Sequence, residues 1–171
     1  GSILYNTILG NTLNKIKLGI TFSNDKYDED VDLFSFERED NSYGAFIEYA
    51  FEGVEKISLI SGLRIDNHNR FGTFLTPRFH LRYSLSDKSS LKFSIGSGRR
   101  AKNIFAENQK LFSSNRLIQI DKKNGSVYGL MPEKAYNYGF SFIQGFTFFK
   151  NQGQFSIDYY KTDFINQVIV D

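Results

Sequence analysis

The stretch TPRFHLRYSLSDKSSLKFSIGSG, residues 76–98, alternates apolar and polar side chains and is broken once, at Ser-Asp-Lys-Ser-Ser. Before the break, residues 78–85 place every second side chain in an apolar set, and residues 91–96 do the same after it. Successive side chains of a β-strand point to opposite faces. The stretch therefore predicts two strands, each with one apolar and one polar face, joined by a short polar turn.

The same alternation recurs along most of the 171 residues. It is found at residues 15–22, 43–51, 57–66, 136–148 and 155–162, with a less regular first strand at residues 3–9. With the two strands above, these segments predict about eight strands and no convincing helix. Phe and Tyr supply all the aromatic residues, 16% of the chain, and there are only two prolines. This composition suits long β-strands, because aromatic residues favour pleated surfaces and proline breaks ladders.

The predicted connections alternate between short and long. Short turns are predicted at Leu9–Asn14, Phe51–Lys56, Leu85–Ser90 and Lys150–Gln154, and longer loops at Asn24–Ser42, Asn67–Phe74 and Arg99–Ala135. In an up-and-down antiparallel sheet, successive connections lie at opposite ends. Short turns at one end and long loops at the other are typical of transmembrane β-barrels. Several strands also reach the roughly 9–11 residues that a tilted membrane-spanning strand needs.

Alternation alone fits a soluble barrel or sandwich, with its apolar face inward, as well as a membrane barrel, with its apolar face against lipid. The aromatic residues favour the membrane barrel. They lie on the apolar face near both strand ends, with aliphatic residues such as Ile47, Leu59 and Leu81 between them, as in two interfacial girdles. These aromatic residues are Tyr49, Phe51, Tyr83 and Phe148 near the short turns and Phe22, Tyr43, Tyr136 and Tyr138 near the long loops.

Glycine is frequent on the predicted polar face. The glycines there are Gly19, Gly44, Gly62, Gly96, Gly98, Gly139 and Gly145. Glycine leaves room within the wall or lets another structure pack closely against it. A narrow eight-stranded barrel fills its interior with its own side chains. The polar face therefore fits better as part of the wall of a wider barrel whose interior is occupied by something other than its own side chains.

Composition excludes several classes of protein. A net charge of +2 and the absence of any long Lys or Arg run give no case for nucleic-acid binding. The chain has no cysteine, so it can form neither disulfides nor Cys-ligated metal sites. His68 and His80 are its only histidines, and His80 lies between Arg78 and Arg82, where cations oppose protonation and metal binding. No catalytic constellation emerges, so we expect neither an enzyme nor a cofactor.

Three segments carry a resemblance to a known family. TPRFHLRYSLSDKSSLKFSIGSGRRAKNIFAEN (76–108), LMPEKAYNYGFSF (130–142) and SIDYYKTDFINQVIVD (156–171) resemble the β-barrel of TonB-dependent outer-membrane receptors, of the Bacteroidetes type. GLRIDNHNRFG (62–72) is similar to the strand and loop that precede the Pro-Arg start of the next strand. The order of the segments matches the family over nearly the whole chain. One departure is Lys102, where proline is commoner after Arg-Ala.

The resemblance implies a barrel of about 22 strands, plugged by an N-terminal globular domain, in the bacterial outer membrane. Residues 1–171 would then be a single segment of the barrel domain, without the plug and the remaining strands. Its two open edges would pair with copies of itself or with a larger assembly. The implied partners are outer-membrane lipid and lipopolysaccharide, an energy-coupling inner-membrane complex acting through the plug, and a small-molecule or oligomeric nutrient ligand.

The predicted function is a wall segment of an active transporter for a siderophore, cobalamin, or a glycan or peptide. Three alternatives stay open. A stand-alone eight-stranded outer-membrane structural or adhesion protein would have no further strands. An outer-membrane barrel acyltransferase or protease would need a catalytic Ser, His or Asp set at its rim. A lipocalin-like soluble binder would turn its apolar faces inward.

The candidate site residues fall into three groups. Residues expected to face the lumen, with cross-strand pairing of Arg78 or Arg82 to acids, are Glu48, Arg64, Asp66, Arg78, His80, Arg82, Lys92 and Asp158. Residues expected to contact a ligand from extracellular loops are His68, Arg70, Arg99, Arg100, Asn103, Glu107 and Asn108. For Arg99, Arg100 and Lys102, bonding to loop carboxylates such as Glu107 is the plainer interpretation. Asp25, Asp28, Asp30 and Asp32 are weak calcium candidates, because their spacing is not that of an EF-hand.

Overall fold

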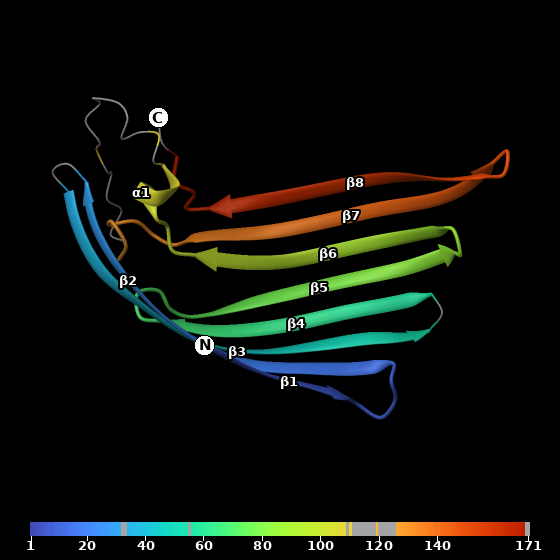
Figure 1. The fold of residues 1–171 in the computed structure, drawn as a ribbon, viewed down its shortest axis with the longest axis horizontal. Helices are drawn as coiled ribbons and strands as arrows, with labels where there is room; N and C mark the ends of the chain where they lie inside the picture. The colour runs from blue at the N-terminus through green and yellow to red at the C-terminus, as the bar shows by residue number, and fades with distance from the viewer. Residues whose placement is uncertain (32–33, 55, 109, 111–118, 120–125, 170–171) are drawn as a thin grey trace.

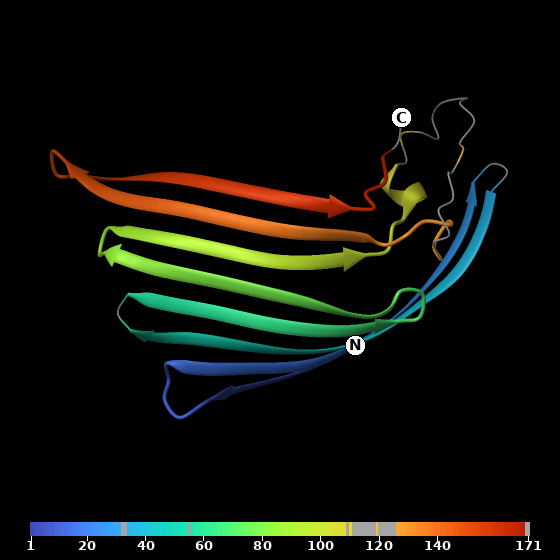
Figure 2. The ribbon, with the colours of Figure 1, turned by 180° about the vertical axis from the view of Figure 1, so that it is seen from behind.

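The structure, a computed structural model, is built around one antiparallel sheet whose eight strands follow one another in chain order (Figures 1 and 2). It describes residues 1–31, 34–54, 56–108, 110, 119 and 126–169. The strands are β1 (Ser2–Ile8), β2 (Asn14–Val31), β3 (Phe34–Val54), β4 (Ile57–His68), β5 (Gly72–Ser86), β6 (Ser89–Arg100), β7 (Glu133–Phe148) and β8 (Asn151–Ile165). The predicted all-β, up-and-down antiparallel fold is confirmed.

One short helical turn, α1 (Ile104–Glu107), follows β6 and was not expected from the sequence. Within the described residues, no helix has the length and apolar character needed to cross a membrane.

The register of the strands separates apolar from polar side chains. One row across β5 to β8 places Leu81, Phe93, Phe140 and Tyr159 directly opposite one another. The next row does the same for Arg82, Lys92, Ser141 and Asp158. Neighbouring rows point to opposite sides of a sheet. We call the side of the first row the apolar face and the side of the second row the polar face.

The apolar face carries large side chains that the chain itself leaves uncovered. Phe148 is 67% exposed, Tyr159 60% and Leu75 58%, and Phe93 in the middle of the sheet is 42% exposed. A soluble barrel or sandwich would bury these residues in a dry centre. Exposed apolar patches beyond a few hundred Å² mark a surface made for a partner or a membrane. The apolar face is therefore a surface suited to contact with a membrane or an apolar partner.

Four short connections lie at the same end of the sheet, which we call the turn end; the other end is the loop end (Figure 1). The connections at the turn end span residues 9–13, 55–56, 87–88 and 149–150. Phe149 and Lys150 have φ values of 45° and 71°, both in the left-handed region. Two consecutive residues of this kind form the type I′ turn whose twist matches that of a hairpin. The tight turn thus continues the strands without splaying them.

The loop end differs from the sequence prediction in two places. Asn24–Ser42 is not a loop: Asn24–Val31 of β2 pairs residue by residue with Phe34–Asn41 of β3. Asn67–Phe74 is mostly strand, with only residues 69–71 between β4 and β5. A hairpin ladder needs only a partner backbone and no apolar face, so the charged 24–41 segment can continue it. The result is a hairpin that projects past the other strands and bends (Figure 2).

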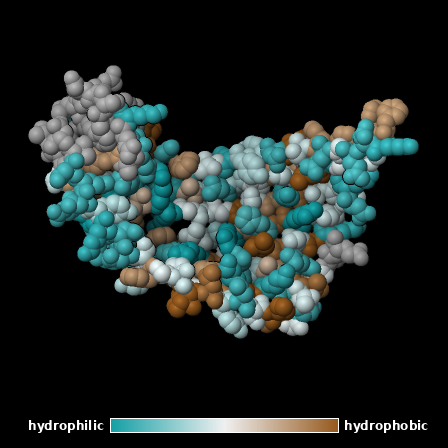
Figure 3. Space-filling view, in the orientation of Figure 1, coloured by the Kyte–Doolittle hydropathy of each residue, from teal (hydrophilic) through white to brown (hydrophobic). Residues whose placement is uncertain are grey.

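The connection at residues 101–132 is long, as predicted, and it holds the only buried hydrophobic side chains among the described residues. Ile104, Phe105, Val127 and Tyr128 are 3–8% exposed and pack against Phe36, Phe71 and Leu130. Phe36 belongs to the projecting part of β3 and Phe71 to the turn between β4 and β5. We call this cluster, with the polar contacts around it, the cap. Hydrophilic residues gather over the projecting hairpin beside it (Figure 3).

Candidate functional site

All eight residues expected to face the lumen lie on the polar face. The register places Glu48 opposite Gly62, Gly62 opposite Arg78, and Asp66 opposite Gly44. It also places His80 opposite Ser94, and Arg82, Lys92 and Asp158 in the row that defines the face. The strand pattern alone therefore places these side chains on one surface.

Two arginines of this face are held by carboxylates. Arg64 binds Asp66 through two bonds, Nε to Oδ2 at 2.7 Å and Nη2 to Oδ1 at 2.5 Å, and it also donates to Thr21 Oγ1 at 2.8 Å. Arg78 forms an ion pair with Glu48, two strands away. A bidentate arginine–carboxylate pair fixes the orientation of both groups as well as adding charge attraction. The expected acidic partner of Arg78 is thus present.

Glycines let these long side chains lie flat against the wall. A Cβ at Gly62 would meet Arg78 Nε at 2.9 Å, and one at Gly44 would meet Thr21 Oγ1 at 2.7 Å beside the Arg64–Asp66 pair. On β7, a Cβ at Gly139 would meet the Tyr160 ring at 2.8 Å. Each glycine leaves space that a cross-strand neighbour occupies. The side chains of the polar face therefore lie close to the backbone of the sheet and leave space in front of this face.

At the loop end, Arg100 joins the strands to the cap. Its Nε donates to Glu133 Oε2 at 2.7 Å, and its Nη2 lies 3.1 Å from Glu107 Oε2 in α1. Burial alone would raise the pKa of Glu133. The Val168 N–H and the cations Arg100 and Lys102 outweigh it and hold that pKa below its ordinary value. The pairing of Arg100 with Glu107 agrees with the plainer interpretation of the sequence.

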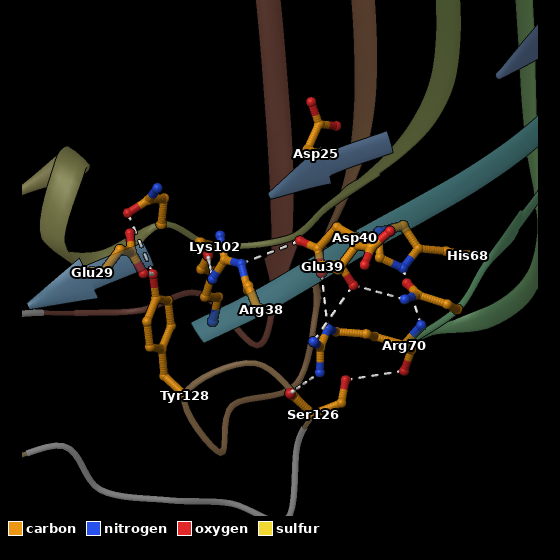
Figure 4. A network of polar contacts seen from close by, with 12 residues as sticks. Asp25, Glu29, Arg38, Glu39, Asp40, His68, Arg70, Lys102, Ser126 and Tyr128 are labelled. Atoms are coloured by element: carbon orange, nitrogen blue, oxygen red, sulfur yellow. Dashed lines mark hydrogen bonds and ion pairs between the residues drawn. The ribbon is translucent and has the colours of Figure 1, made fainter. Parts of the chain in front are cut away.

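A second polar network ties the cap to the projecting hairpin (Figure 4). Asp40 is paired with two arginines: its Oδ1 accepts a hydrogen bond from Arg70 Nε at 2.8 Å, and its Oδ2 lies 3.3 Å from Arg38 Nε in an ion pair without a hydrogen bond. The side chains of Arg38 and Asp40 are each only 6% exposed. The Arg38 guanidinium lies 4.0 Å from the centre of the Tyr27 ring and 4.9 Å from that of Tyr128. A desolvated cation between two rings is held by both packing and charge.

Tyr128 and Ser126 bring the distant end of the cap to this network. The Tyr128 hydroxyl donates to the Glu29 carboxylate, 99 residues away in sequence. Burial first, and Glu29 second, raise the pKa of Tyr128, so it stays a donor. Ser126 Oγ donates to the Arg70 carbonyl oxygen at 3.0 Å. The cap is therefore fastened to β2 and to the turn between β4 and β5.

His68 supports the turn that carries Arg70. Its Nδ1 accepts the Arg70 backbone N–H at 3.2 Å, and its ring stacks on Phe71 with centres 4.4 Å apart. Burial chiefly lowers the pKa of His68; Arg70 and Arg38 add to this effect, and Asp40 opposes it. The neutral ring is therefore the form that fits the turn.

The family model described as "TonB dependent receptor-like, beta-barrel" matches residues 4–171. The chain belongs to the TonB-dependent receptor family. Members of this family are outer-membrane proteins. No curated protein sequence matches the chain.

Solved receptor and transporter structures share the fold of this chain. A mutant of the ferric enterobactin receptor PfeA from Pseudomonas aeruginosa matches 97% of the chain with a TM-score of 0.71 and 18% identity. The siderophore receptor PirA from the same organism matches 95% with a TM-score of 0.67 and 16% identity. The copper transporter OprC matches 94% with a TM-score of 0.52 and 18% identity. The chain spans 26%, 30% and 32% of these structures, so it corresponds to about a quarter to a third of such a receptor.

The residues that the sequence predicted as ligand contacts of this receptor segment fall into two separate groups. Arg100, Asn103 and Glu107 lie around α1, where Asn103 Oδ1 is 3.4 Å from the Tyr128 hydroxyl. His68 and Arg70 lie at the turn between β4 and β5. Asn108 donates to the Ile104 carbonyl oxygen at 2.9 Å, and the Arg99 guanidinium lies 5.0 Å from the centre of the Phe74 ring. Most of these side chains form hydrogen bonds, ion pairs or ring contacts with other residues of the loop end.

Three residues that sequence reasoning did not single out as a site hold the cap: Arg38, Asp40 and Tyr128. Lys102 is 5% exposed and donates to the Asn166 carbonyl oxygen. The sequence predicts that Lys102 bonds to a loop carboxylate, and its Nζ lies 4.0 Å from Glu133 Oε1. For Arg38 and Asp40 the pattern gave no signal, because the aromatic Phe36 in this stretch lies on the polar face of β3, out of phase with Tyr43. Nothing in the sequence indicated that Tyr128 reaches Glu29.

The calcium candidates do not converge. Asp25 lies on the polar face of β2 and accepts from Ser23 Oγ at 2.6 Å, whereas Asp28 and Asp30 differ from it by odd numbers of residues and lie on the other face. Asp32 lies outside the described residues. Over the described ranges, no group of three or more His, Asp or Glu side chains is placed to hold a metal ion.

Proposed function

We propose that this chain forms part of the wall and the extracellular mouth of an outer-membrane receptor that takes up a nutrient ligand. One observation carries the proposal: long strands present uncovered apolar side chains on one face and paired charges on the other. This is the arrangement of a barrel with lipid outside and a wet interior. The loop end, with its cap, is the extracellular side, and the turn end is the periplasmic side.

We propose a metal-chelate ligand of the siderophore class as the cargo, taken up with energy from an inner-membrane complex. Two of the structures that share the fold are named as a ferric enterobactin receptor and a siderophore receptor, and a third as a copper transporter. These names support the choice over cobalamin, a glycan or a peptide. Such a protein is a transporter and has no need of catalytic groups.

Growth under iron limitation tests this proposal. A strain without the full-length receptor is supplied with single ferric siderophores, and uptake of radioactive iron is measured with and without the energy-coupling complex. We expect at least one siderophore whose uptake needs both the receptor and the complex. The control is the receptor with Lys150→Gln, an exposed residue in the turn between β7 and β8. Uptake of every siderophore at the wild-type rate in the deletion strain, with loss of growth on a glycan or peptide instead, would overturn the choice of cargo.

A further inference from the structure

The apolar face has a hollow near the loop end. Ile20 on β2, Ala45 on β3 and Ile65 on β4 lie directly opposite one another there. Ala45 carries only a methyl group, whereas Ile20 and Ile65 beside it are 56% and 46% exposed. The short side chain between two long ones leaves an open space of about 780 Å³, which we call the apolar hollow. Its other lining residues include Ile3, Phe22, Tyr43, Asn67 and Thr73.

The hollow has the width of a single hydrocarbon chain. Strands lie about 4.8 Å apart, so a chain over Ala45 has Ile20 on one side and Ile65 on the other at about one strand spacing. Apolar groups in contact have carbon atoms about 4.0–4.5 Å apart. One chain can therefore contact both isoleucines at once, which a flat apolar surface does not allow.

The lining of the hollow becomes polar toward the loop end. The rings of Phe22 and Tyr43 lie directly opposite each other there, with centres 5.1 Å apart. In the same row, Asn67 Nδ2 donates to Thr73 Oγ1 at 2.8 Å. Aromatic rings at the point where an apolar surface gives way to polar groups are typical of a membrane interface. The hollow therefore lies where a lipid changes from acyl chain to head group.

Past this row, the same side of the projecting hairpin carries hydrogen-bonding groups. Asn24, Glu39 and Asn41 are in phase with Phe22 and Tyr43, so they lie on the same side of the sheet. Asn24 Nδ2 donates to Glu39 Oε1 at 2.6 Å and to Asn41 Oδ1 at 2.5 Å. A carboxylate has about four acceptor sites, and an amide has both donors and acceptors. The hairpin thus offers acceptors to hydroxyl groups next to the hollow.

The charge on this side of the hairpin selects among head groups. Over the described residues of the hairpin, four acids on this side face one base: Asp28, Asp30, Glu37 and Glu39 against Lys26. Hydrogen bonds from Asn24 and Asn41, with the charge of Lys26, hold the pKa of Glu39 below its ordinary value, so it stays ionised. Like charges repel, so a phosphate is disfavoured here. A neutral group that donates hydrogen bonds, such as a sugar hydroxyl, is favoured.

We propose that this surface binds one glycolipid of the outer leaflet, with an acyl chain in the apolar hollow and neutral sugars at Asn24, Glu39 and Asn41. The inference rests on the proposed function, because it requires the apolar face to meet lipid and the loop end to be extracellular. The binding site then spans the boundary of the membrane, and the acidic hairpin faces sugars instead of phosphates.

Other occupants fit this surface less well. A phospholipid would also place an acyl chain in the hollow, but its phosphate would meet the acidic side of the hairpin. A two-fold dimer would bring that acidic side against the same side of its copy, because such an interface uses one patch twice. The charge of the hairpin therefore decides in favour of a neutral, sugar-bearing head group.

Native mass spectrometry of the full-length receptor tests the inference. The receptor is extracted from outer membranes with a polyoxyethylene detergent, which has no sugar, and the retained lipids are identified by mass. We expect the wild-type receptor to retain one glycolipid molecule. Ala45→Leu fills the hollow and should lower the affinity about tenfold. Ser61→Leu is the matched control, because Ser61 is exposed on the same face two rows nearer the turn end, and it should retain the glycolipid.

A second measurement tests the choice of head group. The receptor is stripped of lipid and given either glycolipid purified from the same outer membrane or phosphatidylglycerol. The wild type should prefer the glycolipid, and Glu37→Lys with Glu39→Lys should shift the preference toward phosphatidylglycerol. Asp25→Lys, on the other side of the same hairpin, should leave it unchanged.

Three results would overturn the inference. They are equal glycolipid retention by the wild type and Ala45→Leu, retention of a phospholipid by the wild type, and a receptor dimer that Ala45→Leu abolishes. Siderophore uptake by the same receptors separates the inference from the proposed function. Normal uptake without glycolipid retention removes only the lipid site. Glycolipid retention by a receptor that takes up no siderophore removes only the cargo.

Discussion

Asp40 is the residue on which the charge balance of the cap depends. It is 5% exposed, accepts a hydrogen bond from Arg70 and forms an ion pair with Arg38. We predict that Asp40→Asn loosens the cap by about 3 kcal/mol, because removing one partner leaves buried charge uncompensated. Amide hydrogen exchange at residues 126–130 measures this loss. Asp25→Asn is the matched control: Asp25 is the exposed cross-strand neighbour of Asp40 and should change nothing at the cap. Equal exchange in both variants would contradict the role of Asp40.

His68 makes the cap sensitive to pH. Its Nδ1 must be unprotonated to accept the Arg70 N–H, and burial lowers its pKa from the ordinary 6.5. Because the pKa of His68 is lower in the folded turn than in the unfolded chain, the turn is stabilised at pH values above the ordinary pKa of 6.5. That stability is lost as the pH falls from about 6.5 through the lowered pKa. The groups facing the ring are Asp40, which favours protonation, and Arg70 and Arg38, which oppose it.

We therefore predict that the backbone amides of residues 69–71 are less protected from hydrogen exchange at pH 5.5 than at pH 7.5. Protection is the measured exchange rate corrected for the intrinsic rate at each pH. His68→Gln should remove the extra change. His80→Gln, on the polar face of β5, should keep it. A pH effect of the same size in all three proteins would assign it to other groups.

At the level of the strands, glycine sets how closely cross-strand side chains lie to the wall. In Gly62→Val, the new side chain would meet Arg78 Nε and Cγ at about 3 Å or less and push the guanidinium from Glu48. Overpacking of this kind costs about 1 kcal/mol or more. Urea unfolding of the full-length receptor in detergent or lipid should show the loss. Gly98→Ala is the control, because a Cβ there meets nothing within 4 Å. If Gly62→Val and Gly98→Ala lowered the stability to urea equally, the cause would be β-propensity or folding yield and not contact with Arg78.

The strands and their faces could be predicted from the sequence, and the cap could not. A period of two is a local pattern, so residues 76–98 alone fix which side Leu81 and Arg82 occupy. The charged residues 24–41 predict a loop because they are polar, and Tyr27 breaks the alternation of β2, although Tyr27 and Arg38 lie directly opposite each other in the ladder. The Tyr128–Glu29 contact joins residues 99 positions apart, and no local pattern encodes such a pairing.

For the whole molecule, the decisive prediction is that the apolar face points to lipid and the polar face to water. A narrow test is possible because the chain has no native cysteine. Single cysteines at Phe79, Leu81, His80 and Arg82 alternate between the two faces of β5. In intact outer membranes, we predict that a lipid-soluble maleimide labels the cysteines at 79 and 81. The cysteines at 80 and 82 should escape it.

A small, water-soluble maleimide reports the other face. It should reach positions 80 and 82 in the receptor only as far as the lumen contents permit, and more fully after those contents are loosened with urea. Labelling at 79 and 81 by the water-soluble reagent, with protection from the lipid-soluble one, would reverse the two faces. The barrel would then have a dry interior, and the receptor assignment of this wall could not stand.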